Sequence, residues 1–216
     1  MYKRQVLRKE TSEVGADYPD LGKLIENMYE TMYNAKGVGL AAPQVGLDLR
    51  LFVIDSTQMI EEDSKSPDKG IKRTFINAEI IEESGPKWSF EEGCLSIPDV
   101  RENVQRQTHV RIRYQDESFN QHEETFEGIT ARVIQHEYDH IEAVLFTDYL
   151  KPLKRRLLKK RLDNISKGKV SASYKMKFPA ARWHLVIFAA IYENQQSFTS
   201  ISGGLEIDPS HKMEQT

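Results

Sequence analysis

The sequence has little of what marks secreted and membrane proteins. Its only cysteine is Cys94, so an internal disulfide cannot form and no oxidising compartment is implied. The longest apolar run, Trp183–Tyr192, is interrupted by His184 and is about half the ~20 residues that a membrane-spanning helix needs. Residues Met1–Glu10 lack the apolar stretch of a signal peptide. We therefore expect a cytoplasmic protein with no membrane partner and no disulfide partner.

An excess of charge of one sign is also missing. The chain has 30 Lys and Arg against 33 Asp and Glu, which gives a net charge of -3. The molecule as a whole is therefore not expected to attract nucleic acid. Its 216 residues, 29% charged and 39% hydrophobic, are ordinary for a soluble protein and suit one domain.

Hydrophobic periodicity predicts helices that flank a group of strands. The predicted helices are Asp20–Ala35, Gly128–His140 and Pro152–Ile165. The predicted strands are Arg50–Asp55, Thr74–Ile81, Val110–Tyr114 and Glu123–Phe126. In the last helix, the residues expected on the apolar side are Leu153, Leu157, Leu158, Leu162 and Ile165. The polar stretch Met59–Gly70 is predicted as an exposed loop. This arrangement favours the α+β class.

The strongest local signal is the sequence Gln-His-Glu-Tyr-Asp-His that ends at His140. On a helix, His136 and His140 lie one turn apart, so both rings can face one metal ion. Glu137 can then reach a metal-bound water and act as general base. Two surface histidines would be the plainer interpretation. Both histidines, however, share a helical stripe with Ile129 and Val133 and are expected to face inward, where imidazoles need partners.

Cys94 is the best candidate for a third metal ligand. A catalytic metal needs three protein ligands and an open position. The preceding Gly93 allows a close backbone approach, which suits a ligand loop. Taken alone, a single cysteine is more often a small buried hydrophobic residue, and a nucleophilic Cys–His pair is a further alternative.

A third segment, Gly37–Gln44, is rich in glycine. It lacks the Lys-Ser/Thr pair of a phosphate-binding loop, and it follows a predicted helix rather than preceding one. Considered by itself, this segment predicts no more than a tight turn.

Taken together and in this order, the segments GVGLAAPQ, EGCLS and QHEYDH resemble the peptide deformylase family. The resemblance runs from about Val6 to Pro179. It implies a single compact α+β domain, residues 1–179, in which antiparallel sheets pack around a central metal-ligand helix, with a further C-terminal helix. It also implies removal of the formyl group from formyl-methionine at the N-terminus of nascent polypeptides, with release of formate. Residues 180–216 match nothing in the family and are expected to be a loosely ordered extension.

The resemblance implies roles for individual residues. The metal ligands would be Cys94, His136 and His140. Glu137 would be the general base and acid, and the Gln44 side chain and the Leu95 backbone N–H would form the oxyanion hole. The substrate-binding residues would be Val38, Gly39, Glu92, Gly93 and Arg101. Glu92 and Arg101 are expected at the mouth of the methionine pocket, and Gln135 and Asp139 are expected to orient groups around the ligand helix.

The ligand set bears on the metal. Two imidazoles and one thiolate suit Fe(II), Zn(II), Ni(II) or Co(II), and spacing does not choose among them. The resemblance points to Fe(II) as the native ion, with zinc, nickel or cobalt able to replace it.

The chain departs from the family in one place near the motif. The family commonly has glycine three residues after the second histidine, and this chain has Ala143. If the position lies inside a packed helix, the added methyl group would overpack it at a cost of ~1–3 kcal/mol.

Two other functions remain alternatives at this point. One is a general metallopeptidase with the same His-Glu-x-x-His motif, which usually takes its third ligand downstream of the helix. The other is a binding protein that has kept the fold and lost activity. The basic stretch Lys151–Arg161 is either a solvated helix face or a contact with ribosomal RNA phosphates.

Overall fold

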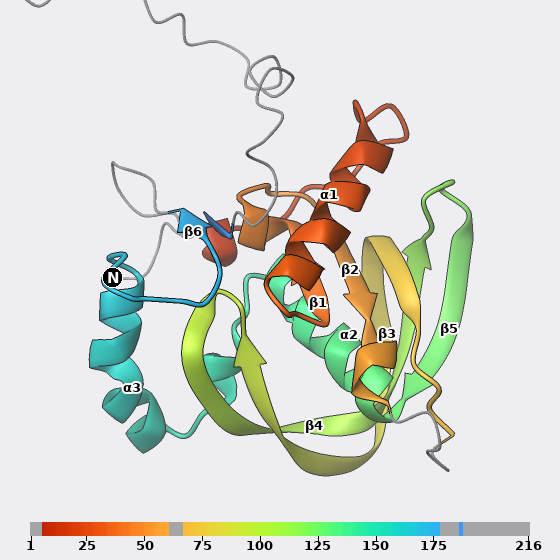
Figure 1. Ribbon diagram of the computed structural model, residues 1–216. Coiled ribbons are helices and arrows are strands. Elements are labelled where there is room, and N and C mark those ends of the chain that lie inside the picture. The colour runs from red at the N-terminus through yellow and green to blue at the C-terminus, as the bar shows by residue number, and fades with distance from the viewer. Residues whose placement is uncertain (1–5, 61–66, 178–185, 188–216) are drawn as a thin grey trace, which may run out of the picture.

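A five-stranded antiparallel sheet organises the chain, and its strands lie in the order of the sequence. The computed structural model describes residues 6–60, 67–177 and 186–187. The strands of the sheet are β1 (Gly39–Ala41), β2 (Leu51–Asp55), β3 (Lys72–Cys94), β4 (Ile97–Gln115) and β5 (Gln121–Glu127). Each strand pairs with the next (Figure 1). The strands β2, β3, β4 and β5 correspond to the four predicted strands, which confirms those predictions.

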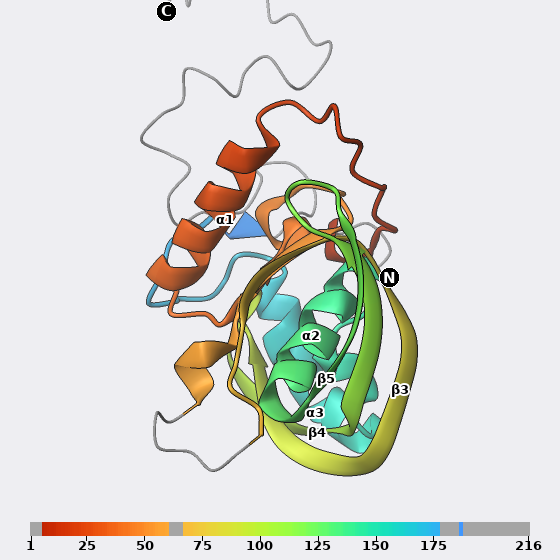
Figure 2. The same cartoon turned by 90° about the vertical axis from the view of Figure 1, so that its right-hand side faces the viewer.

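The long strands β3 and β4 are bent. Their pairing register shifts at four places, and the last shift lies between Gly93 and Cys94. Such irregularities increase the local twist and bend of a strand pair. As a result the pair curves beneath the molecule, and the sheet encloses helix α2 (Gly128–Ile141) (Figure 2). The predicted central position of this helix against the antiparallel sheet is therefore confirmed.

The strand β2 is buried on both faces, because a helix covers each side of this part of the sheet. Side chains alternate along a strand, so Leu51 and Val53 face the core of α1 (Leu21–Asn34). Phe52 and Ile54 face the core that contains residues of α2. This two-sided burial explains why the strand is apolar throughout its length.

The start of α2 is fixed by a residue from the predicted loop. Asp68 accepts hydrogen bonds from the backbone N–H of Thr130 at 2.7 Å and from its hydroxyl at 2.6 Å. A carboxylate at a helix N-terminus satisfies free N–H groups and favours the helix dipole. The prediction of an exposed loop over Met59–Gly70 is therefore wrong at Asp68, which is 8% exposed.

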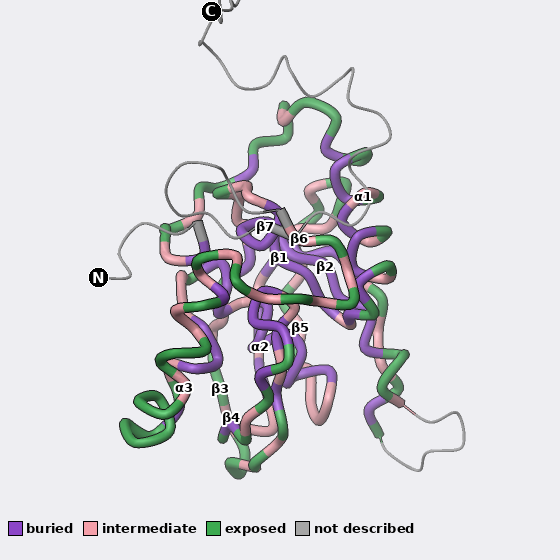
Figure 3. The backbone as a smooth tube through the Cα atoms, turned by 60° about the vertical axis from the view of Figure 1, so that its left-hand side comes forward, coloured by how far each residue is buried: buried purple, intermediate pink, exposed green. Residues whose placement is uncertain are grey.

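Helix α3 (Pro152–Ile165) begins and ends as predicted but turns only part of its apolar side inward. Leu158, Leu162 and Ile165 pack against a third core cluster. Leu153 and Leu157 are 69% and 74% exposed, so their predicted place on the buried side is wrong. The three packed residues have the spacing i, i+4, i+7, and the exposed pair falls on a separate stripe. Figure 3 shows that most residues of α3 are exposed.

Short elements complete the described chain. The 3₁₀ helices are η1 (Val6–Arg8), η2 (Ala42–Val45), η3 (Ser56–Met59) and η4 (Phe146–Tyr149). Strands β6 (Met176–Lys177) and β7 (Val186–Ile187) form a separate pair. The expectation of a loosely ordered Ala180–Thr216 lies outside the described residues, apart from β7. Within the described part of the chain, no helix is long and apolar enough to cross a membrane.

The end of α2 corrects the expectation for Ala143. This residue lies beyond the helix and has a φ of 58°, in the left-handed region that favours glycine. The N–H of Val144 bonds to the carbonyl of Asp139 at 2.8 Å, and that of Ala143 bonds to the carbonyl of His140 at 3.3 Å. This pair of bonds is the Schellman C-cap. The predicted overpacking inside the helix is therefore wrong, and the cost of alanine here is backbone strain.

Candidate active site

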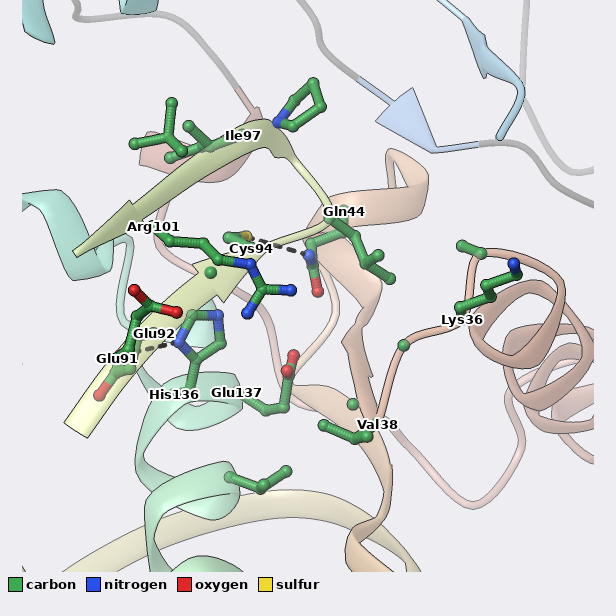
Figure 4. Close-up of a pocket in the computed structure, with 18 of the residues that line it drawn as sticks. Lys36, Val38, Gln44, Glu91, Glu92, Cys94, Ile97, Arg101, His136 and Glu137 are labelled. Atoms are coloured by element: carbon green, nitrogen blue, oxygen red, sulfur yellow. Dashed lines mark hydrogen bonds and ion pairs between the residues drawn. The ribbon is translucent and has the colours of Figure 1, made fainter. Parts of the chain in front are cut away.

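A cavity of about 440 Å³ lies where α2, β1 and the junction of β3 with β4 meet. Ten of the eleven predicted site residues line it: Val38, Gly39, Gln44, Glu92, Gly93, Cys94, Leu95, Arg101, His136 and Glu137. Figure 4 shows side chains from α2, from the junction of β3 with β4 and from the residues that flank β1 around this cavity. Three segments that are far apart in the sequence thus form one site. The eleventh residue, His140, does not line the cavity but contacts Cys94.

Three donor groups in this site can hold a metal ion. The ligand atoms of Cys94, His136 and His140, here called the ligand triad, all lie within 4.8 Å of one another. Cys94 Sγ is 3.3 Å from His140 Nε2. All three residues are 9% exposed or less, and Cys94 is a free thiol. A buried cluster of two imidazoles and a thiol suits a divalent transition metal.

The carboxylate of Glu92 fixes the ring of His136. His136 Nδ1 donates a hydrogen bond to Glu92 at 3.0 Å, which leaves Nε2 for the centre of the triad. Arg106 bonds to the same carboxylate at 2.7 and 3.0 Å, and Arg132 bonds to it at 2.8 Å. Burial alone would raise the pKa of Glu92, but the hydrogen bonds and charges of His136 and Arg106 outweigh it and hold this pKa well below its usual range. Glu92 is therefore a buried anion in the cavity wall.

Arg106 extends this network to Asp139, about one turn further along α2. It forms an ion pair with Asp139 at 2.8 Å, and Asp139 also accepts a hydrogen bond from the Tyr149 hydroxyl at 2.9 Å. The predicted orienting residue Asp139 thus acts within this network. Gln135 instead donates a hydrogen bond to Glu83 at 2.7 Å and ties α2 to β3.

The sequence interpretation missed Arg106 and Arg132, although one of them left a signal. Arg106 follows Val104 by two residues on β4, so it faces the core at a position where an apolar residue is expected. A buried charge on an apolar face needs a partner. Arg132 lies on α2 without a comparable pattern.

Glu137 lies against the backbone of β1. A Cβ atom placed on Gly39 would come within 2.4 Å of Glu137 Oε1, so only glycine leaves this carboxylate its present position. Burial raises the pKa of Glu137 to about 7. Its Oε2 atom has no hydrogen-bond partner among the described residues. The carboxylate is therefore held in place and is free to interact with a ligand of the cavity.

Gln44 is held in one orientation by its own helical turn. Its Oε1 accepts a hydrogen bond from the Ala41 N–H at 2.8 Å, so its Nε2 must point toward the triad. This Nε2 donates to Ser96 Oγ at 3.2 Å and contacts Cys94 Sγ at 3.6 Å. The side-chain amide thus presents N–H groups beside the ligand triad.

A residue outside the three motifs also reaches this site. The hydroxyl of Tyr174 donates a hydrogen bond to the carbonyl of Leu95 at 2.6 Å. Burial raises the pKa of Tyr174 to about 12, so its hydroxyl is protonated at neutral pH. The sequence interpretation did not single out Tyr174, because no motif surrounds it.

A sequence model described as polypeptide deformylase matches residues 1–156. The chain belongs to the peptide deformylase family. The peptide deformylase of Flavobacterium johnsoniae is 57% identical over 186 residues, which cover 84% of this chain and 95% of that protein. The peptide deformylase of Christiangramia forsetii is 54% identical with the same coverage. The similarity to these peptide deformylases thus covers most of the chain.

Solved deformylase structures have the same fold. The crystal structure of a peptide deformylase from Legionella pneumophila is 40% identical, with a TM-score of 0.64, and the match covers 76% of this chain and 91% of that one. A Synechococcus elongatus peptide deformylase, solved in complex with actinonin, is 38% identical with a TM-score of 0.64, covering 77% of this chain and 85% of that one.

These likenesses decide the general function. The chain is an enzyme, a hydrolase of the deformylase family that removes the N-formyl group from newly made proteins. The family is metal-dependent, and the ligand triad can hold the metal. The alternatives of a general metallopeptidase and of a binding protein are not favoured.

Proposed function

We propose that formyl-methionyl peptides are hydrolysed in the cavity beside the ligand triad, with Glu137 as the general base and acid. The observation that carries this proposal is the convergence of three buried metal-binding groups within 4.8 Å on a cavity that Glu137 and Gln44 also line. A nucleophilic role for Cys94 is less well supported, because its Sγ lies among imidazoles that suit a shared ion.

The donor chemistry fits a divalent ion of the first transition series. Fe(II) is our proposal for the native ion, on the family resemblance, and zinc, nickel and cobalt suit the same ligands. When bound, such an ion would supply Lewis acidity and would lower the pKa of a coordinated water to roughly 7.

The chain's own residues then supply the proton transfers and the stabilisation of charge. Glu137 accepts a proton from the attacking water and delivers it to the departing amine. Nε2 of Gln44 and the N–H of Leu95 donate hydrogen bonds to the formyl oxygen as it gains negative charge. Loss of one such donor typically raises the barrier by about 3–4 kcal/mol.

Binding of the peptide is assigned to the cavity wall. We propose that the backbone groups of Val38 and Gly39 hold the substrate chain, and that Gly93 allows its close approach. Arg101 is exposed and lies over the cavity in Figure 4, which suits a place at the mouth of the methionine pocket. Glu92 lines the same cavity, but its carboxylate is occupied by His136 and two arginines. Its proposed contact with substrate therefore involves the backbone or the side-chain stem.

The test is a comparison of two substrates with one anaerobically prepared, Fe(II)-loaded protein. Formate release is measured from a formyl-Met peptide, and cleavage is measured for the same peptide without the formyl group. We expect formate from the first and no cleavage of the second. Cleavage of the unformylated peptide would indicate a general metallopeptidase. Absence of both reactions in metal-loaded protein would indicate a binding protein.

The helix α3 is proposed to contact ribosomal RNA. Its N-cap Lys151 and its residues from Pro152 to Leu157 are exposed, which suits binding to phosphates. Ion pairs with nearby carboxylates, such as Lys154 with Glu102 and Arg161 with Asp99, reduce the available charge. Binding to purified ribosomes should weaken steeply as salt is raised, and a variant with Arg156→Glu should bind less. Binding that is independent of salt would contradict the proposal.

We also propose that the catalytic unit ends by Pro179. Every group assigned to catalysis or metal binding precedes Arg161, the cavity-lining Tyr174 precedes Pro179, and the family match ends at residue 156. Deletion of Ala180–Thr216 is therefore expected to leave formate release nearly unchanged. A shortened protein that fails to fold, or whose Tm drops by many degrees, would show that the boundary is wrong.

A further inference from the structure

The segment that follows α3 returns to the cavity. Ala172, Ser173 and Tyr174 line the same cavity as the ligand triad. This segment lies beyond residue 156, where the family match ends. The ring of Tyr174 is partly buried and packs, together with Leu95, against the core cluster under α1. The segment is thus a wall of the site and is anchored at its Tyr174 end.

Tyr174 bonds to the turn from which the proposed Leu95 donor projects. Strand β3 ends at Cys94 and β4 begins at Ile97, so Leu95 and Ser96 form a two-residue turn between paired strands. The groups of such a turn lie outside the ladder and need partners of their own. The Leu95 carbonyl receives the Tyr174 hydroxyl at 2.6 Å, and Ser96 Oγ receives Gln44 Nε2 at 3.2 Å. The turn is therefore held from both sides.

The N–H and the carbonyl of Leu95 lie in the two peptide planes that meet at its Cα, so fixing the carbonyl restricts the directions open to the N–H. The Leu95 side chain gives a further restraint, because a Cβ atom on Gly37 would lie 2.6 Å from Leu95 Cδ1. We propose that Tyr174 is a positioning residue, which aims the Leu95 N–H at the formyl oxygen through its hydrogen bond to the Leu95 carbonyl. This inference rests on the proposed role of Leu95 in the oxyanion hole.

A positioning role predicts an effect on turnover rather than on binding. The hydrogen bond from the Leu95 N–H is strongest when negative charge develops on the formyl oxygen in the transition state. A misdirected N–H should therefore lower kcat and leave KM nearly unchanged. One neutral hydrogen bond of this kind corresponds to a change of about tenfold. A residue that only closes the cavity would instead alter KM.

The experiment uses the full chain and the single change Tyr174→Phe, which removes the hydroxyl and keeps the ring. We expect kcat for formyl-Met peptide to fall about tenfold, with KM, metal content and Tm close to those of the parent. The matched control is Tyr33→Phe. Tyr33 also donates a short hydrogen bond, to Asp55 at 2.6 Å, but it does not line the cavity. This control should leave kcat unchanged.

The outcomes separate this inference from the proposed function. An unchanged kcat in Tyr174→Phe, with an active parent, would overturn the positioning role alone. So would a rise in KM at constant kcat, or a large drop in Tm with matching loss of metal, because these indicate a wall or a purely structural role. A metal-loaded parent that releases no formate would overturn the proposed function itself.

Discussion

Glu92 holds the ring of His136 through a 3.0 Å hydrogen bond to Nδ1, and it does so from inside a buried network. The same carboxylate bonds to Arg106 and Arg132, and Arg106 continues to Asp139. Hydrogen bonds of this kind fix the tautomer and the orientation of a metal-binding histidine. Metal affinity and the stability of the fold are therefore coupled at Glu92.

The substitution Glu92→Gln tests this coupling. It keeps an acceptor for His136 but removes the charge that balances two buried guanidinium groups. We expect metal affinity to fall about 10–100-fold and the free energy of unfolding to fall by about 3–5 kcal/mol. Metal titration and chemical denaturation measure the two effects. The neighbouring Glu91→Gln, at an exposed position, is the control and should change neither. A Glu92→Gln protein as stable and as metal-loaded as the parent would contradict the account.

Ala143→Gly should stabilise the protein. Ala143 has a φ of 58° in the C-cap of α2, where an L side chain is strained and glycine is not. We expect a gain of about 1 kcal/mol in the free energy of unfolding, visible as a rise in Tm. The control is Ala35→Gly, at the end of α1 with a φ of -85°, which should not stabilise. A loss of stability in Ala143→Gly would mean that the methyl group makes favourable contacts that outweigh the strain.

The difference between the two interpretations of Ala143 shows what the sequence can and cannot predict. The helical stripe of His136 and His140 predicted their inward direction, because periodicity depends only on local geometry. The end of the helix depends on capping bonds made by Ala143 and Val144, three and four residues past the last periodic position, His140. The sequence pattern therefore does not show that Ala143 lies in a left-handed cap rather than on the packed helix. Leu153 and Leu157 were misplaced for a related reason, since two apolar stripes on α3 compete and only the packing chooses between them.

The chemistry of the site was more predictable than its supporting network. Gln44, Cys94 and Glu137 lie in short motifs, and the motifs meet in one cavity as expected. Arg106 and Tyr174 belong to no motif and reach the site through strand curvature and the return of the chain after α3. Contacts between residues that are distant in sequence arise from tertiary packing and leave little local pattern.

The pair of Arg8 and Asp148 predicts sensitivity to acid. Arg8 and the Leu145 N–H hold the pKa of Asp148 below its usual range, despite the opposite effect of burial. The folded protein therefore binds this proton less readily than the unfolded chain. The stabilisation is fully present above the ordinary pKa of about 3.9, and it is lost as pH falls through the lower folded pKa.

Denaturation of the parent and of Asp148→Asn at several pH values measures this effect. The parent should be more stable by about 1–3 kcal/mol at pH 6, and the difference should shrink below about pH 4. In the control, Asp48→Asn, an exposed carboxylate 3.9 Å from Lys9 is removed, and the change should stay under about 0.5 kcal/mol. A difference between parent and Asp148→Asn that persists undiminished at pH 2 would contradict the assigned cause.

The central claim is that Glu137 transfers the protons of formyl hydrolysis beside an intact metal site. The decisive measurement compares formate release by the parent and by Glu137→Gln after both are loaded with Fe(II) and assayed for metal. Because the ligand triad is untouched, we expect equal metal content. We expect kcat to fall by about 10²–10⁴-fold, since glutamine cannot accept or deliver the proton. A fully metal-loaded Glu137→Gln protein that releases formate within a few-fold of the parent rate would contradict the account.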